Sequence, residues 1–183
     1  QAAAPAGEGM AVAVFAGGCF WCMEVPFEKL SGVVSVESGY TGGPELGPTY
    51  HAVSRGETGH FEAIRVVYHP EQIDYAKLLS VFWHNVDPTQ ADGQFCDKGD
   101  QYRTAIFVAT AEERKLAEAS KFATEATLER SVVTPVFPAA TFWLAEDYHQ
   151  DFYKKKPTRY QSYRAGCGRD HRLQQLWGKL AGS

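Results

Sequence analysis

Two cysteines lie three residues apart, directly after a pair of glycines, in the segment GGCFWCMEVPF at residues 17–27. Cys19 follows an apolar run and stands where a helix is expected to begin. Unpaired backbone N–H groups and the positive end of the helix dipole would favour its thiolate there. Gly17 and Gly18 suit a backbone that approaches a ligand closely. We therefore expect Cys19 to be a nucleophile, with a buried and inert cysteine as the alternative.

Cys22 lies close enough to Cys19, across one helical turn, for a disulfide between the two. A CxxC pair of this kind is typical of thioredoxin-like redox proteins, although the phenylalanine and tryptophan inside it are bulky for an exposed exchange motif. A closed zinc site is disfavoured, because Cys96 and Cys167 have neither a second cysteine nor a histidine at ligand spacing. We therefore expect no metal.

Cys167 lies between Gly166 and Gly168 in the segment RAGCGRD near the C-terminus. Flexible glycines on both sides allow a thiol to move. This suits a resolving cysteine, which attacks an oxidised Cys19 to form a disulfide. A surface thiol without a role is the alternative.

The elements that must position these residues follow from the hydrophobic pattern. Short apolar or alternating runs predict strands at residues 10–18, 33–40, 60–70 and 102–110. Helical spacing predicts helices at residues 20–32, 74–86 and 111–130. This β-α-β-β-α-β order is that of the two-layer ferredoxin-like plait. We predict an α+β fold in which a mixed sheet carries helices, followed by a long irregular C-terminal segment.

Length and composition predict one domain. At 183 residues the chain suits a single catalytic domain, which we expect over residues 10–183 with a mobile C-terminal tail. Residues 1–9 are rich in Ala, Pro and Gly and are expected to be a flexible leader with no part in the fold, from a shortened chain or a cleaved export signal. Residues 41–59 form a long predicted loop, and loops of that length tend to be functional.

Charge and hydropathy exclude two classes of partner. The formal net charge is -4, which gives no electrostatic reason to expect nucleic-acid binding. No apolar run approaches the roughly 20 residues that cross a bilayer. We expect a soluble monomer that has no membrane partner, in either the cytoplasm or the periplasm.

Five segments together resemble a known family. GGCFWCMEVPF, SGYTGG, GHFEAIRVVYHP, DKGDQYRTAIF and AEDYHQDFY occur in the order typical of the peptide methionine sulfoxide reductases of the A type. The resemblance implies a thiol-dependent reductase that converts the S epimer of methionine sulfoxide, free or in proteins, to methionine. It implies antioxidant protein repair through a cysteine sulfenic acid and an intramolecular disulfide. It implies no bound cofactor, and thioredoxin as the external dithiol reductant.

The resemblance also implies the catalytic pair. Cys19 matches the nucleophile and Glu62 matches the acid that protonates the sulfoxide oxygen. On the predicted strand Glu62 shares a face with apolar Ile64 and Val66, and burial there would raise the pKa of its carboxyl and keep it protonated. A surface carboxylate on a half-exposed strand is the alternative.

Further site residues follow from the same resemblance. Tyr40 and Tyr102 match two tyrosines whose hydroxyls hold the sulfoxide oxygen. The resemblance also implies substrate-binding residues. Phe20 and Trp21 match an apolar pocket for the S-methyl group. Asp97 matches an acidic residue that organises the site, and His149 matches a histidine of the last motif. A structural role is the alternative for the histidine, through helix capping or hydrogen bonding.

The sequence departs from many relatives at Cys22, where glycine or serine often follows GCFW. Cys22 and Cys96 are therefore alternatives to Cys167 as the cysteine that resolves the sulfenic acid. We expect Cys167, because a mobile tail can reach Cys19 whereas pairing with Cys22 would strain the start of the helix. Two other functions stay open: a CxxC disulfide oxidoreductase, and a module that binds oxidised methionine without reaction.

Overall fold

The four predicted strands and two short ones near the C-terminus form one mixed sheet in the computed structural model, which describes residues 1–183. Its members are β1 (Ala11–Gly17), β2 (Val33–Thr41), β3 (Phe61–Tyr68), β6 (Thr104–Val108), β7 (Val136–Pro138) and β8 (Trp143–Leu144). The strand order is β7-β6-β1-β3-β2-β8, with every neighbouring pair antiparallel except the parallel pair of β6 and β7. The fold is therefore α+β with a mixed sheet, as expected from the sequence.

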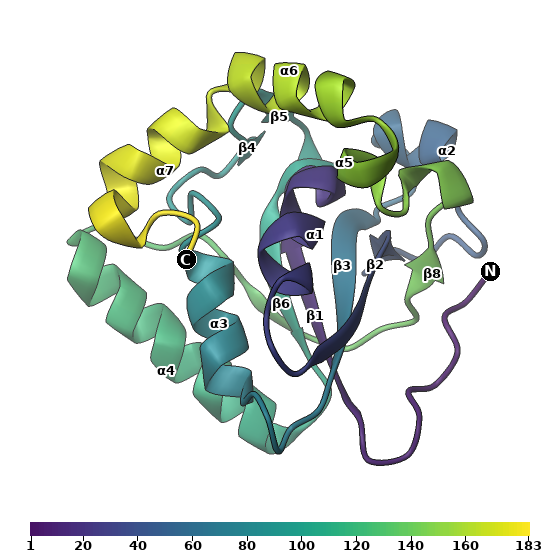
Figure 1. The fold of residues 1–183 in the computed structure, drawn as a ribbon, viewed down its shortest axis with the longest axis horizontal. Helices are drawn as coiled ribbons and strands as arrows, with labels where there is room; N and C mark the ends of the chain where they lie inside the picture. Colours follow the sequence, from purple (N-terminus) through teal and green to yellow (C-terminus); the bar gives the residue numbers. More distant parts are fainter.

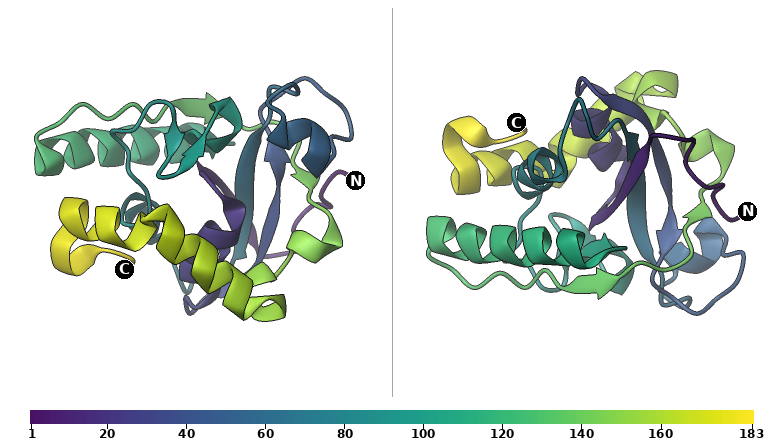
Figure 2. Two further views of the ribbon diagram at one scale, coloured as in Figure 1. Left: turned by 90° about the horizontal axis from the view of Figure 1, so that it is seen from above. Right: turned by 90° about the horizontal axis from the view of Figure 1, so that it is seen from below.

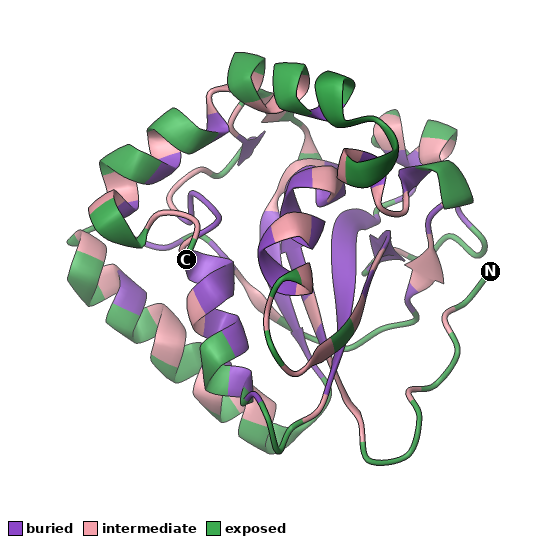
Figure 3. Ribbon diagram, in the orientation of Figure 1, coloured by how far each residue is buried: buried purple, intermediate pink, exposed green.

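Three helices pack on one face of this sheet (Figures 1 and 2), namely α1 (Phe20–Glu28), α3 (Tyr75–Trp83) and α4 (Ala111–Leu128). Met23 and Phe27 of α1 lie four residues apart, as do Leu78 and Phe82 of α3, so each pair shares one side of its helix. All four are buried in one cluster with Phe15 of β1. In Figure 3 α1 and α3 are accordingly mostly buried, whereas α4 is largely exposed.

Helix α1 is shorter than the segment 20–32 that its pattern predicts. It begins at Phe20, directly after Cys19, and ends at Glu28. Pro26 lies inside the helix and lacks the N–H that would bond the carbonyl of Cys22. Cys19 immediately precedes the helix, close to the end of β1, and Cys22 lies in its first turn.

The first residues of the chain pair with β8, so the expectation that they take no part in the fold is wrong. The backbone N–H of Ala3 donates to the carbonyl of Phe142 at 2.8 Å, and Leu144 donates to the carbonyl of Gln1 at 2.9 Å. Arg65 on β3 donates to the carbonyl of Ala4 at 2.7 Å. These contacts help cover the sheet face opposite the helices.

The segment after β8 is helical, so the expectation of a long irregular C-terminal segment is wrong. It contains α5 (Phe152–Lys155), α6 (Pro157–Cys167) and α7 (Arg169–Trp177). Proline at the first position starts α6, and Gly168 at φ +75° ends it in the left-handed region that glycine adopts readily. Leu173 and Trp177 of α7 join the main core.

Two small elements complete the surroundings of the site. Helix α2 (Tyr50–Ser54) lies within the predicted loop 41–59, and the Thr49 hydroxyl caps it by accepting from the Ala52 N–H at 3.2 Å. A short hairpin pairs β4 (Gly93–Gln94) with β5 (Asp97–Lys98).

None of the helices combines the length and apolar composition that crossing a membrane requires.

Candidate active site

A cavity of about 60 Å³ opens at the start of α1. Its lining residues come from α1, α2, β3, β5, α6 and the short 3₁₀ turn Asp100–Tyr102. They are Cys19, Phe20, Trp21, Tyr50, Glu62, Asp97, Tyr102 and Tyr163. The structure therefore brings the predicted nucleophile and the predicted acid into one small cavity.

Cys19 stands immediately before α1 and is 7% exposed. The turn in front of it requires glycine, because Gly18 has φ +83° and a Cβ there would lie 2.6 Å from Cβ of Gln94. Glycine thus allows the hairpin that carries β4 and β5 to approach the nucleophile closely.

Cys19 and Cys22 are both free, buried thiols of one cluster, so each affects the ionisation of the other. Burial and the neighbouring Cys22 raise the pKa of Cys19 well above its ordinary value. The neighbouring Cys19 and the positive charges of Arg169 and Arg164 lower the pKa of Cys22 to about 6. The pair therefore loses its first proton more readily than an ordinary cysteine, and this ionisation belongs to the pair rather than to one sulfur. The sequence led us to expect the thiolate at Cys19.

Glu62 points from β3 to the helix-covered face, as its alternation with Ile64 and Val66 predicts. One carboxyl oxygen accepts a hydrogen bond from the Phe20 N–H at 3.1 Å, so the glutamate also caps the start of α1. Burial raises the pKa of this carboxyl to about 8, partly offset by the Phe20 bond, and nearby Asp97 raises it further. Glu62 is therefore a carboxylic acid at neutral pH that can donate a proton into the cavity.

His149 lies outside the residues that line the cavity, so it does not share that lining with the other predicted substrate-binding residues. Its ring is 1% exposed, and Nδ1 accepts a hydrogen bond from the Trp21 Nε1–H at 3.0 Å. Burial lowers the pKa of His149 to about 4, which keeps the ring neutral and able to accept this bond. Trp21 also stacks on Phe152 of α5 with the ring centroids 3.7 Å apart. His149 therefore positions one aromatic wall of the cavity.

Tyr40 is the second predicted site residue that the structure places outside the cavity lining. This tyrosine is fully buried and its hydroxyl donates to a Glu146 carboxylate oxygen at 2.8 Å, outside the residues that line the cavity. The other oxygen of Glu146 accepts from the Tyr50 N–H at 2.9 Å. Tyr50, which the motifs did not single out, lines the cavity together with the predicted Tyr102. Its position in the long loop 41–59 was the only sequence signal for it.

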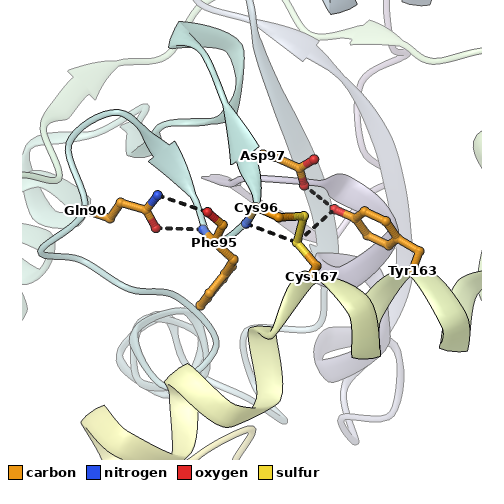
Figure 4. The surroundings of a disulfide bond; sticks show 6 residues. All are labelled: Gln90, Phe95, Cys96, Asp97, Tyr163 and Cys167. Atoms are coloured by element: carbon orange, nitrogen blue, oxygen red, sulfur yellow. Dashed lines mark hydrogen bonds between the residues drawn. A yellow bond between two sulfur atoms is a disulfide. The ribbon is translucent and has the colours of Figure 1, made fainter.

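Tyr163 of α6 is the second residue that the sequence did not reveal. It lines the cavity, and its hydroxyl donates to the carboxylate of Asp97 (Figure 4). The same hydroxyl lies 3.9 Å from Sγ of Cys167. Tyr163 thus lies between the cavity and the disulfide that includes Cys167. No sequence signal pointed to it, because α6 itself was not predicted.

Cys167 is bonded to Cys96, so the expected pairing of Cys167 with Cys19 is not the one that the structure contains (Figure 4). Cys96 lies at the exposed turn of the β4–β5 hairpin, and Cys167 ends α6. The four cysteines therefore form an inner pair of free thiols and an outer disulfide.

Two groups of side chains have metal-ligand spacing, but each already has other partners. Cys96 and Cys167 lie with Asp97 in the first group, and their two sulfurs are bonded to each other. The second group contains Glu24, Glu28 and Asp151. The ammonium of Lys154 lies 2.7 Å from the carboxylate of Glu28 and 2.8 Å from that of Asp151, so a side-chain cation already occupies this position.

Comparison with known proteins agrees with this arrangement. Residues 11–181 match the family model described as peptide methionine sulfoxide reductase. The chain is 50% identical over 169 residues to the peptide methionine sulfoxide reductase MsrA of Halalkalibacterium halodurans, covering 91% of this chain and 96% of the relative. It is 48% identical over 169 residues to MsrA of Bacillus subtilis, with the same coverage of 91% and 96%.

Solved structures give the same result. The reduced form of Mxr1 from Saccharomyces cerevisiae matches with a TM-score of 0.80 and 28% identity, over 84% of this chain and 90% of that one. Methionine sulfoxide reductase A of Corynebacterium diphtheriae matches with a TM-score of 0.73 and 31% identity, over 82% of this chain and 77% of that one. Since the family model covers nearly the whole chain and relatives are about half identical to it, the chain belongs to the peptide methionine sulfoxide reductase family.

Proposed function

We propose that this chain reduces the S epimer of methionine sulfoxide, free or within proteins, to methionine with electrons from a dithiol. As a member of its family the chain is an oxidoreductase that acts on methionine sulfoxide. The observation that carries the specific proposal is the meeting of Cys19 and a protonated Glu62 in one cavity of about 60 Å³. A cavity of this size suits the small methyl sulfoxide end of a methionine side chain.

The reaction needs an attacking thiolate and a proton donor at the same time, because sulfoxide oxygen is a poor leaving group. Cys19 gives its proton to Cys22 and attacks the sulfoxide sulfur, while Glu62 protonates the oxygen. Methionine then leaves, and the oxygen stays on Cys19 as a sulfenic acid. Glu62 regains a proton from solvent. Phe20 and Trp21 provide the apolar wall for the S-methyl group.

Oxygen recognition falls to two tyrosines in this proposal. Tyr50 and Tyr102 both line the cavity, and burial raises the pKa of Tyr50 to about 12 and that of Tyr102 above its ordinary value. Both therefore keep their hydroxyl protons and can donate to the sulfoxide oxygen. Asp97, held by the Tyr163 hydroxyl, organises the side of the cavity nearest the hairpin.

The sulfenic acid on Cys19 is resolved by Cys22 in this proposal. Cys22 lies one turn away as a free thiol, whereas the sulfur of Cys167 is bonded to Cys96. This favours an alternative weighed from the sequence over the expectation of direct attack by Cys167. Reduced Cys96 and Cys167 then take up the oxidation by thiol–disulfide exchange, which returns Cys19 and Cys22 to free thiols.

Thioredoxin is the proposed external reductant, and the outer disulfide is its proposed target. The family resemblance supports the partner, and the exposure of Cys96 supports the target. We also propose that the chain works as a monomer, since one chain by itself supplies both the nucleophile and the acid of the cavity. The strand order β6-β1-β3-β2 supports the ferredoxin-like plait as its framework, with residues 10–183 as one catalytic domain.

Methionine stoichiometry without added reductant tests the scheme. The fully reduced chain is expected to form two methionines per chain, one for each disulfide. A chain with its outer disulfide intact is expected to form one, as is the C96S/C167S variant. C19S is expected to form none, and so is the wild-type chain given the R epimer. Binding of the S epimer with no methionine formed would show a binding module and overturn the proposal.

Mass mapping after one turnover tests the resolving cysteine. The fully reduced C22S variant should keep its sulfenic acid, visible as a dimedone adduct on Cys19. A rapid Cys19–Cys167 disulfide in C22S would instead support Cys167, and a Cys19–Cys96 disulfide would support Cys96.

A further inference from the structure

Gln101 is a buried glutamine that directly precedes Tyr102 in the 3₁₀ turn Asp100–Tyr102. The residue is 6% exposed. Its side-chain Nε2 donates to the backbone carbonyl of Ser54, the last residue of α2, at 2.9 Å. Helix α2 begins at Tyr50, so this one hydrogen bond joins the two elements that carry Tyr50 and Tyr102 into the cavity.

Two glycines leave space for the Gln101 side chain. Gly99 has φ +129°, and a Cβ there would lie 2.4 Å from Oε1 of Gln101. Gly56 has φ +75°, and a Cβ there would lie 3.5 Å from the same oxygen. Glycine adopts such backbone conformations readily, and a side chain at position 99 would push the amide away. The chain thus accommodates the amide between the turn that follows α2 and the turn that precedes Tyr102.

The loop that contains α2 is closed at its base by His60, which is 2% exposed. The Gly43 N–H donates to Nδ1 of His60 at 3.1 Å, and Nε2 of His60 donates to the Glu45 carbonyl at 2.7 Å. The two ends of the loop also touch, because a Cβ at Gly43 would lie 2.5 Å from the His60 nitrogen. Since its ends are fixed to each other, the orientation of α2 depends on contacts farther along the loop.

Two of these contacts lie at opposite ends of α2. At its start the Tyr50 N–H donates to Glu146 at 2.9 Å, and at its end the Ser54 carbonyl accepts from Gln101. A helix held only at Tyr50 could turn about that point, and the turn would redirect the Tyr50 ring. The bond from Gln101 prevents this rotation.

We propose that Gln101 is a positioning residue that sets the separation of the Tyr50 and Tyr102 hydroxyls, so that both can donate to one sulfoxide oxygen. It acts on Tyr50 through α2 and on Tyr102 through its own turn. This role rests on the function proposed above, in which these two hydroxyls hold the oxygen. Hydrogen bonds weaken steeply as their geometry departs from the optimum, so the separation of the two hydroxyls matters for the first step.

Q101M tests this role, because methionine keeps a side chain of similar length but lacks the amide. Its kcat/KM for the S epimer should fall about 10–100-fold, the scale of loss for a displacement near 1 Å, mainly through a higher KM. The number of methionines formed per chain should equal that of the wild-type chain. Q161M is the matched control and should leave kcat/KM unchanged, because Gln161 is exposed on α6.

The tyrosine variants Y50F and Y102F distinguish positioning from a general structural role. Single-turnover rates are measured for Y50F, Y102F and Y50F/Y102F, each with and without Q101M. If Gln101 acts through the two hydroxyls, adding Q101M to Y50F/Y102F should slow the reaction by no more than about twofold, close to the error of such comparisons. A loss of the same factor in every background would overturn the proposed role.

The same set of variants separates this role from the proposed function. If the wild-type chain forms no methionine, or if Y50F and Y102F both react at the wild-type rate, the proposed function fails in that part whatever Gln101 does. If both tyrosine variants are slow and Q101M matches Q161M, only the role of Gln101 fails. If Q101M does not fold, Q101N decides, because its amide is one carbon too short to reach Ser54. A wild-type kcat/KM in Q101N would then overturn the role.

Discussion

Glu62 illustrates how a single residue combines two tasks at the site. Its carboxyl caps the first turn of α1 through the Phe20 N–H and remains protonated because it is buried on the core side of β3. The same placement holds the start of α1, and with it Cys19, beside the acid. The alternation of Glu62 with Ile64 and Val66 was enough to predict this placement, because residues two apart on a strand share a face.

The pH dependence of the first methionine burst should report these two ionisations. The rate should rise through about pH 6, where the coupled thiols lose their first proton, and fall through about pH 8, where Glu62 loses the proton that it must donate. E62Q should slow the burst by roughly 10²–10⁴-fold, the usual contribution of general acid catalysis, and should abolish the fall at high pH.

The matched control is E57Q, because Glu57 is an exposed carboxylate paired only with Arg55. Its burst rate and pH profile should equal those of the wild-type chain. A fall at high pH that persists in E62Q would assign that ionisation to another group.

Sequence motifs did not locate every tyrosine near the site. The motif SGYTGG pointed to Tyr40, which lies on β2 directly opposite Glu62 but turns its hydroxyl to Glu146. Tyr50 reaches the cavity from α2, a five-residue helix within a loop rich in Gly and Pro. Its orientation depends on Glu146, about a hundred residues later in the chain, so no local pattern could have predicted it.

At the level of elements, the pairing of β8 with β2 connects that remote carboxylate to the site. Glu146 follows β8 by two residues, and Ala145 donates to the Ser38 carbonyl on β2 at 2.9 Å. Gly39 allows this close contact, because a Cβ there would lie 2.4 Å from the Trp143 carbonyl oxygen. The small residue therefore keeps β8 and Glu146 in place.

Replacing Gly39 with alanine should displace β8 and loosen Tyr50 without touching the cavity directly. Overpacking of this kind usually destabilises a protein by about 1–3 kcal/mol, which in a chain of this size lowers Tm by roughly 2–12 °C. KM for methionine sulfoxide should rise several-fold while the methionine burst keeps its amplitude. G7A is the control, since the nearest atom to its Cβ would lie at an ordinary 3.6 Å. Equal Tm and KM in G39A and G7A would contradict this role for Gly39.

Elements with a strong repeat were predictable, and those held by distant contacts were not. Strands β1 and β3 and helix α4 carry clear periodicity. Helices α6 and α7 each bury few side chains, mainly Tyr160 on α6 and Leu173 and Trp177 on α7, so their polar sequence resembles an irregular tail. The outer disulfide to Cys96 and the hydrogen bond from Arg169 to the Gly17 carbonyl hold these helices in place. Each of these two contacts joins residues far apart in the sequence.

For the whole molecule, the outer disulfide joins the β4–β5 hairpin to the C-terminal helices across a separation of 71 residues. The two segments flank the cavity, contributing Asp97 from one side and Tyr163 from the other. In the proposed cycle this bond forms and breaks at each turnover. The stability of the whole chain should therefore change with the redox state of one exposed bond.

The C96S/C167S variant measures that coupling. A disulfide closing a loop of this length typically stabilises the folded state by about 2–4 kcal/mol, because it restricts the unfolded chain. For a chain of this size the oxidised wild-type protein should melt roughly 4–16 °C above the variant. With excess dithiol the two chains should melt within about 2 °C of each other, since only the crosslink distinguishes them. A gap that persisted under dithiol would mean that the sulfur atoms themselves, rather than the bond between them, hold α6 against the hairpin.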